Sequence, residues 1–283
     1  MILITGGTGQ SGAEIVRQLA ATGTRFRALV RNPAKADAVR LNGVEIVRGD
    51  MADKQSLTPA LKGVDRLLLL SSPDATFVEA QGTVISAAKQ AGVRHIVKFS
   101  AMTADPKSPS TFPRMHGQTE DLVRASGMAW TFLRPTFFMQ NFLGLSQMVK
   151  QGTMYQPAGD GKSAPVDIRD IAAVAVKTLT EPGHESKAYD ITGPELLSYT
   201  EIARVFAEVA GHAVKYQDIP PAAAKQAMLG VGMPEFVADA LNQLMDQLRA
   251  GAYARTSNVV RDVAKKQPVT FAQFAHENAA AWR

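Results

Sequence analysis

The sequence predicts an α/β protein with a Rossmann-type, doubly wound parallel sheet and a smaller C-terminal lobe. Three observations predict it: a glycine-rich turn near the N-terminus, alternating strand-like and helix-like segments through the first half, and a change of pattern after Pro135. The 283 residues, of which 46% are hydrophobic, can form one large α/β domain with an appended lobe.

The first expected element is a strand over residues 2–5, and the second is a helix over 12–22. Residues 2–5 are uniformly apolar, as a strand buried on both faces requires. The helix is indicated by apolar residues at helical spacing, namely Ala13, Val16, Leu19 and Ala20. The periodicity therefore changes across the turn TGGTGQSG that joins them.

Three glycines of this turn have separate expected roles. Gly6 permits the tight turn, Gly9 lets the backbone approach a diphosphate, and Gly12 lets the helix press on the strand. The free N–H groups and the positive dipole end of the helix then favour phosphates, although a turn that serves only the backbone is the alternative. A dinucleotide is expected on Gly6, Thr8, Gly9, Gln10, Ser11 and Gly12.

The end of the second strand, expected over 25–30, indicates which dinucleotide is preferred. NAD-binding folds place an acidic residue there, and its carboxylate would repel a 2′-phosphate. This chain has Arg31, whose guanidinium suits a phosphate in bidentate geometry. Asn32, Lys35 and Arg27 are candidates to complete an anion pocket. We therefore expect NADP(H), the alternative being a solvated surface arginine.

Strands and helices continue to alternate after this point, which favours right-handed βαβ units in a parallel sheet. Further strands are expected over 44–48, 65–71, 94–100 and 129–134. Further helices are expected over 54–62, 77–91 and 114–126. Each of these helices ends close to a glycine that can stop it, namely Gly63, Gly92 or Gly127.

In such a sheet, ligands bind beyond the carboxyl ends of the strands. The cofactor contacts expected at these ends are Asp50, Met51, Ser71, Ser72, Ser100 and Pro135. Asp50 is interpreted either as a partner for an adenine amino group beside Met51 or as a turn-forming residue. The serines are expected to line the path to the nicotinamide.

After Pro135 the chain becomes aromatic and apolar, which suits the wall of a pocket for a planar substrate, with ordinary core packing as the alternative. The expected substrate contacts are Phe137, Phe138, Met139 and Asn141.

Elements of the C-terminal half are indicated by caps and periodicity. Asp167 is the expected N-cap of a helix through Leu179, and Ser198 with Glu201 has capping-box spacing. A strand is expected over 188–192, and helices over 222–229 and 235–249.

We expect residues 1–135 with 164–194 to form the NADP-binding domain, and 136–163 with 195–283 to form the substrate-binding lobe.

Composition excludes several classes of function. The chain contains no cysteine, which excludes thiolate catalysis and cysteine–zinc sites, and its five histidines lack metal-binding spacing. The net charge of +5 is dispersed, so nucleic-acid binding is not indicated. No apolar run is long enough for a membrane span, and the first strand begins at Ile2, leaving no room for a leader. We expect a cytoplasmic protein without membrane or nucleic-acid partners, and leave a homodimer open.

The sequence resembles the NmrA-like group of atypical short-chain dehydrogenase/reductases, which includes bacterial NADPH:quinone reductases and triphenylmethane reductases. The resemblance rests on motifs along nearly the whole chain: TGGTGQSG, LVRNPAKA, GDMAD, AGVRHIVKFSA, HGQTE, GMAWTFLRPTFFMQNF and YDITGPE. The more specific parts are residues 31–35 and the pattern His116-x-x-Thr119-Glu120. The resemblance implies NADP(H) as the cofactor and an oxidoreductase activity.

One departure from this group concerns the catalytic acid. Typical members reduce carbonyls with a Tyr-x-x-x-Lys pair, in which lysine lowers the phenol pKa. None of the five tyrosines here has a lysine four positions later. Aligned through Glu120, the usual lysine position is His116 and the usual tyrosine position is Phe112, so the phenol is absent.

A ketone that accepts hydride becomes an alkoxide and needs an acid, whereas a quinone or cationic dye delocalises the charge. We therefore expect hydride transfer to a quinone-like or other conjugated aromatic acceptor. The catalytic candidates are Ser100 and His116, the latter with a near-neutral pKa that suits a proton donor or ribose contact. Asn141 matches the quinone-reductase pattern, and Pro135 departs from it. The alternatives are a non-catalytic NADP(H) sensor or a reductase or isomerase of a dedicated biosynthetic pathway.

Overall fold

The computed structural model describes all 283 residues except the side chain of Lys35, and the chain divides into two compact units. Unit 1 consists of Met1–Pro109, Pro113–Arg134 and Ile171–Asp190. Unit 2 consists of Ser110–Phe112, Pro135–Asp170 and Ile191–Arg283. The expected assignment of cofactor binding to one part of the chain and substrate binding to another stays a prediction.

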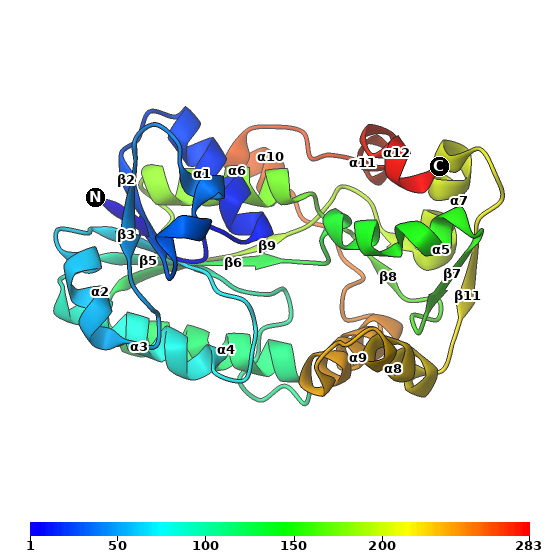
Figure 1. Cartoon of the computed structure of the whole chain (residues 1–283), viewed down its shortest axis with the longest axis horizontal. Coiled ribbons are helices and arrows are strands. Elements are labelled where there is room, and N and C mark those ends of the chain that lie inside the picture. Colours follow the sequence, from blue (N-terminus) through cyan, green and yellow to red (C-terminus); the bar gives the residue numbers. More distant parts are fainter. The chain divides into compact units, whose positions relative to one another are not determined.

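A seven-stranded sheet forms the centre of unit 1 (Figure 1), with the order β3-β2-β1-β4-β5-β6-β9. The strands are β1 Ile2–Ile4, β2 Phe26–Val30, β3 Val44–Arg48, β4 Arg66–Leu69, β5 His95–Phe99, β6 Ala129–Pro135 and β9 Lys187–Ile191. Every pairing from β3 to β6 is parallel. The amides of Ser186 and Thr136 bond across β6 and β9 to the carbonyls of Trp130 and Ile191, so this pair is parallel too. The predicted doubly wound sheet is confirmed.

Helices cover both faces of this sheet (Figure 1). Helices α1 Gln10–Ala21 and α6 Ile168–Thr180 lie on one face, and α2 Lys54–Leu61, α3 Phe77–Gln90 and α4 Thr111–Ala125 lie on the other. The connection from β2 to β3 uses the short 3-10 helices η1 Pro33–Lys35 and η2 Asp37–Val39. Helix α4 begins at Thr111 rather than at the expected residue 114, because its first turn accommodates Pro113.

Apolar side chains of the sheet and helices form the core of unit 1. Leu3, Leu67, Ile96 and Phe132 are fully buried in a cluster that also includes residues of α2 and α3. The central strands are buried on both faces, as their continuous apolar sequences predict. The carboxyl ends of the strands are therefore held in fixed register.

Unit 2 contains short strands and several helices. Its strands are β7 Thr153–Gln156, β8 Lys162–Ser163, β10 Leu197–Ser198 and β11 Lys215–Asp218; β7 pairs with β11, and β8 with β10. Its helices are η3 Met139–Leu145, α5 Ser146–Lys150, α7 Tyr199–Ala210, α8 Pro221–Gly230, α9 Glu235–Arg249, α10 Val259–Ala264, α11 Phe271–Glu277 and α12 Ala279–Trp282. The buried aromatic residues Phe206, Phe271, Phe274 and Trp282 lie in one cluster that forms its core.

The two predicted helix caps are confirmed. The Arg169 backbone N–H donates to Asp167 Oδ1 at 2.8 Å at the start of α6. Ser198 and Glu201 form a reciprocal capping box at the start of α7. Within the part of the chain that the structure describes, no helix combines the length and the apolar character that a membrane crossing needs.

Candidate functional site

The turn between β1 and α1 depends on two of its glycines for its own backbone geometry. Gly6 has φ +66°, and a Cβ there would lie 2.5 Å from the Leu70 carbonyl oxygen. A Cβ on Gly12 would lie 2.1 Å from the Gly6 carbonyl oxygen. Both approaches are closer than any side chain tolerates, so Gly6 and Gly12 hold α1 against the end of β1.

Gly9 has a different environment. Its φ of −79° suits any residue, and a Cβ there would meet, among the described atoms, only the Gly6 oxygen at an ordinary 3.5 Å. Gly9 is the N-cap of α1, and no described side chain caps the first turn, beside which Thr8 and Gln10 are exposed. A glycine that the protein backbone does not require, at an uncapped helix start, fits the close approach of a diphosphate.

The predicted anion pocket at the end of β2 is only partly present. Arg31 is exposed directly after the strand, and Asn32 Oδ1 accepts a hydrogen bond from the Ala34 N–H at 3.0 Å, so it caps η1. The side chain of Lys35 lies outside the described residues. A contact between Arg31 and a 2′-phosphate stays a prediction.

The prediction that Arg27 joins this pocket is wrong. Its guanidinium bonds Glu45 Oε2 at 3.0 Å and the carbonyl oxygens of Ala60 and Lys62 at 3.2 and 2.6 Å. These contacts tie β2 to β3 and to the end of α2. Arg27 consequently has a structural role.

The residues predicted to contact the cofactor after β3 and β4 lie in the loops that follow these strands. Asp50 Oδ1 accepts the Ala52 N–H at 2.9 Å, which is the turn-forming alternative, while Met51 packs against the core cluster. Ser71 Oγ accepts from Gln81 Nε2 at 3.0 Å, and Ser72 is exposed. Cofactor contacts from these residues stay predictions.

Ser100, at the end of β5, lies in a buried ionic network. Its Oγ donates to Glu120 Oε1 at 2.6 Å, and Arg134 Nε donates to the same oxygen at 2.9 Å. Arg124 Nη2 adds a bond to Glu120 Oε2 at 3.0 Å. The Ser100 hydroxyl hydrogen is thus engaged by a carboxylate, and a catalytic role for Ser100 stays a prediction.

Lys98 is the neighbour of His116, and sequence reasoning missed it. Lys98 is fully buried; its Nζ lies 3.3 Å from His116 Nδ1 and donates to the Phe99 carbonyl at 3.2 Å. The ammonium also lies 5.1 Å from the centre of the Phe77 ring, which contacts the His116 imidazole edge-on. The sequence did mark Lys98 as unusual, because it lies in a strand expected to be buried on both faces. Lysine is almost never fully buried unless it is paired.

Burial and charge change the titration of both groups. Burial lowers the pKa of Lys98 to about 7, although the Glu120 carboxylate opposes the shift. Burial, followed by the nearby Lys98 charge, holds the pKa of His116 well below 6.5. The expected near-neutral pKa of His116 is therefore wrong, and the imidazole is neutral at pH 7.

In unit 2, Phe112 occupies the position where the family's phenol is expected. It is 9% exposed, and its ring contacts the Phe236 ring of α9 edge-on at 6.2 Å. No acidic hydrogen is available from this side chain.

The predicted substrate residues differ in burial. Phe137 contacts Tyr253 edge-on at 4.7 Å, Phe138 is half-buried and Asn141 is exposed. Met139 is fully buried in the core of unit 2 with Phe142. The substrate role predicted for Met139 is corrected to core packing, and Pro135, at the end of β6, is also buried.

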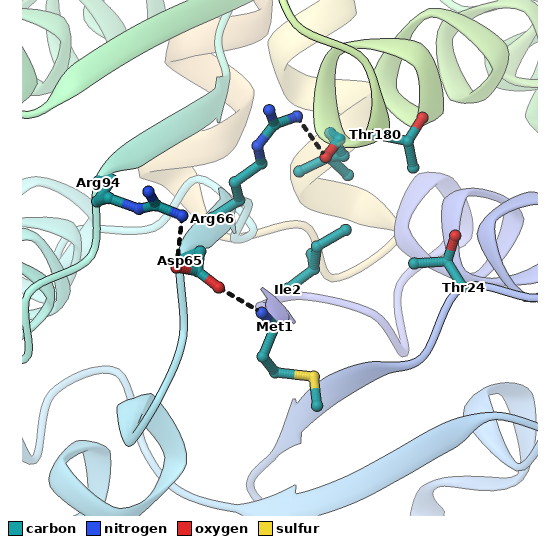
Figure 2. Close-up of a pocket in the computed structure, with 8 residues that line it drawn as sticks. Met1, Ile2, Thr24, Asp65, Arg66, Arg94 and Thr180 are labelled. Carbon is teal, nitrogen blue, oxygen red and sulfur yellow. Dashed lines mark hydrogen bonds and ion pairs between the residues drawn. The ribbon is translucent and has the colours of Figure 1, made fainter.

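A hollow of about 280 Å³ in unit 1 lies at the other end of the sheet, where β1 and β4 begin. Figure 2 shows Asp65 in this hollow between the N-terminal amine, at 2.6 Å, and Arg94, at 2.7 Å. Ligands of doubly wound sheets bind at the carboxyl ends of the strands. Asp65 is already paired, and the Arg66 guanidinium bonds the carbonyl oxygens of Leu179 and Glu181, so we do not assign this hollow to the cofactor.

Comparisons with known proteins find relatives that match nearly the whole chain. An NAD(P)H azoreductase of Xenophilus azovorans is 44% identical over 283 residues, which cover 100% of this chain and 99% of that protein. An NADPH-dependent quinone oxidoreductase from Escherichia coli, solved with NADPH, has a TM-score of 0.92 and 33% identity, covering 98% of this chain and 99% of its own. A triphenylmethane reductase from Citrobacter sp., solved with NADP(H), has a TM-score of 0.90 and 28% identity, covering 99% and 100%.

These relatives are NAD(P)H-dependent oxidoreductases, and the two solved ones contain the phosphorylated dinucleotide. The NmrA-like family model matches residues 1–275. The chain therefore belongs to the NmrA-like family.

Proposed function

We propose that this protein is an NADPH-dependent oxidoreductase that transfers hydride directly to a conjugated acceptor, such as a quinone, an azo compound or a cationic dye. The observation that carries the proposal is Phe112, which the alignment through Glu120 matches to the phenol of a carbonyl reductase and whose ring contacts Phe236. Without that acid, an acceptor that delocalises charge is favoured over a ketone. Relatives named for azo, quinone and triphenylmethane reduction support the same substrate class.

The residues proposed to hold the cofactor are those at the carboxyl ends of β1 and β2. The turn of Gly6, Gly9 and Gly12 binds the diphosphate through backbone N–H groups, and Arg31 pairs with the 2′-phosphate. NADPH supplies the hydride when bound. Asp50, Ser71 and Ser72 are retained as proposed contacts along the adenine and nicotinamide sides, together with Met51, Ser100 and Pro135.

His116 is proposed as the group that gives a proton to the reduced acceptor. Because its pKa lies well below 6.5, the ring is neutral and donates from one nitrogen. Its Nδ1 contacts Lys98, which leaves Nε2 for a ligand. A neutral imidazole is a weak acid, which suits an acceptor whose reduced form needs little assistance.

The acceptor contacts proposed in unit 2 are Phe137, Phe138 and Asn141. Two aromatic rings provide apolar surface for a planar molecule, and the exposed Asn141 amide provides hydrogen bonds.

The test is NADPH oxidation by the purified protein with a panel of acceptors. The panel contains menadione, an azo dye, a cationic triphenylmethane dye and a simple ketone. We expect turnover with at least one conjugated acceptor and little with the ketone. Tight NADPH binding without oxidation by any acceptor would contradict the proposal and favour a sensor of NADP(H).

A further inference from the structure

A lysine that is fully buried in a strand needs a physical explanation, and Lys98 of β5 is such a residue. Burying an ammonium group costs several kcal/mol unless hydrogen bonds and charges compensate. The compensation here is modest: one backbone carbonyl, one imidazole nitrogen and the face of Phe77. A methionine or leucine would fill the same space without that cost, so stability alone does not account for the amine.

The position of Lys98 follows from the alternation of β5 and the period of α4. Lys98 and Ser100 are two residues apart, so they project from the same face of β5. His116 and Glu120 are four residues apart on α4 and share one face of the helix. The two pairs form adjacent contacts, Lys98 with His116 at 3.3 Å and Ser100 with Glu120 at 2.6 Å.

The contact between Lys98 and His116 restricts the imidazole. An ammonium group has three donors and no acceptor, so His116 Nδ1 must accept and cannot carry a hydrogen. The hydrogen of the neutral ring is then on Nε2. No other described side chain bonds Nε2, and His116 is only half-buried.

We propose that Lys98 is a positioning residue that fixes His116 in the Nε2–H form and exchanges a proton with Nδ1 during turnover. This inference rests on the proposed function, in which His116 Nε2 faces the acceptor. Hydride transfer leaves a reduced quinone or azo compound one proton short, whereas a cationic dye is neutralised by the hydride and needs no proton.

Two coupled proton transfers supply that proton. The Nε2–H bond breaks as the acceptor gains a proton, and the Nδ1–H bond forms as one Nζ–H bond of Lys98 breaks. Lys98 is then a neutral amine. After the product leaves, water returns a proton to Nε2, and the Nδ1 proton returns to Lys98. Each cycle thus takes one proton from solvent, and the buried Lys98 needs no access to water of its own.

A titration of Lys98 and His116 reflects the groups that surround these two side chains. His116 and Glu120 face Lys98 from α4, and the uncharged Phe77 ring faces it from α3. Glu120 is itself paired with Arg124 and Arg134. Burial lowers the pKa of Lys98 to about 7, so the amine is poised to give and regain a proton near neutral pH.

The decisive experiment is NMR of the cofactor-free protein labelled with nitrogen-15 histidine, in which His116→Gln identifies the His116 signals. In the wild type we expect a neutral Nε2–H imidazole at about pH 6, where Lys98 still carries its proton. In Lys98→Met we expect a mixture of tautomers and a higher His116 pKa, because the cation that lowers it is gone. Lys89→Met, which removes an exposed lysine of α3, is the matched control and should change neither property. Unchanged His116 signals in Lys98→Met would overturn the proposal.

A titration of the wild type keeps the test independent of whether Lys98→Met folds. As pH rises and Lys98 loses its proton, the neutral amine can accept from Nδ1–H, and the Nε2–H preference should weaken. A tautomer balance that stays constant across this transition would also overturn the proposal.

Turnover provides the second readout. With a saturating quinone, whose reduced form needs a proton, Lys98→Met should lower kcat by about tenfold and change its pH profile, with NADPH affinity unchanged. A wild-type kcat profile in the variant would refute the relay. If the wild type itself reduces no acceptor, the proposed function fails, whereas the NMR result still tests the contact between Lys98 and His116.

Discussion

Two arginines flank β2, and these single residues provide a test of cofactor preference. Arg31 follows the strand and Arg25 precedes it, and both are exposed. We expect Arg31→Ala to weaken NADPH binding by about tenfold or more, since a charged pair with phosphate is worth about 1.5–3 kcal/mol and about 1.4 kcal/mol is tenfold. NADH binding should not change. Fluorescence titration measures both affinities.

Arg25→Ala is the control for that prediction, because it removes the same charge at the opposite end of the strand. It should leave both affinities as in the wild type. Equal affinities for NADPH and NADH in the wild type would contradict the assignment of Arg31.

Gly9 and Gly12 are expected to respond differently to a single added methyl group. Gly9→Ala should fold normally but bind NADPH weakly, because its Cβ meets no protein clash and occupies the space of the diphosphate. Gly12→Ala should lower stability, because its Cβ would lie 2.1 Å from the Gly6 oxygen. Circular dichroism, urea unfolding and NADPH titration separate the outcomes. Wild-type affinity in Gly9→Ala would show that this glycine serves only the backbone.

Among the secondary-structure elements, β5, α4 and β6 are joined by Glu120. It is 1% exposed and accepts bonds from Ser100, Arg124 and Arg134. Glu120→Gln should destabilise the protein by about 3–5 kcal/mol, because it leaves the partly buried Arg134 without its counter-charge. Urea unfolding tests this. Asp121→Asn removes the exposed neighbouring carboxylate and should cost about 1 kcal/mol or less. If Glu120→Gln and Asp121→Asn lowered the free energy of unfolding equally, the bonds to Glu120 would not be stabilising the fold.

Most elements of unit 1 could be predicted because their signals are local. The apolar run at residues 2–5 and the glycine turn indicate structure within a few residues, as the caps Asp167 and Ser198 do in unit 2. The strands β7 and β11 were not predicted, because each is short and its pairing partner is distant in sequence.

Site residues were less predictable than elements, for a physical reason. Sequence position shows which residues follow a strand, but it does not show what else bonds them. Arg27 and Ser100 have the right chemistry and are engaged by Glu45 and Glu120 respectively. Lys98 became important only through its distance to His116.

For the molecule as a whole, buried histidine makes stability depend on pH. His95 is 4% exposed and its Nε2 contacts Thr131 Oγ1 at 2.9 Å. Burial, followed by the charge of Arg66, lowers the pKa of His95 from 6.5 to about 4. Protonation of His95 therefore favours the unfolded chain. The contribution of His95 to the stability of the folded protein is fully present above pH 6.5 and is lost as the pH falls from 6.5 to about 4. His116, whose pKa is also lowered, adds to this loss.

The whole loss from His95 should be about 3 kcal/mol, because lowering a pKa by one pH unit corresponds to about 1.4 kcal/mol. Urea unfolding at about pH 7 and about pH 5 measures the larger part of it, about 2 kcal/mol. His95→Gln should show a smaller difference between the two conditions, whereas His212→Gln, at an exposed position, should behave as the wild type. If His95→Gln lost as much stability between about pH 7 and about pH 5 as the wild type, His95 would not be the cause of the pH dependence.

The proposed function depends on one step, in which hydride passes directly from NADPH to a conjugated acceptor without a phenolic acid. Single-turnover stopped flow with 4-deuterated NADPH and a quinone or dye measures that step. We predict that deuterium slows NADPH oxidation, that the rate stays high although position 112 is phenylalanine, and that a simple ketone gives almost no oxidation. Rapid reduction of the ketone, or no oxidation with any acceptor despite tight NADPH binding, would contradict direct hydride transfer to a conjugated acceptor.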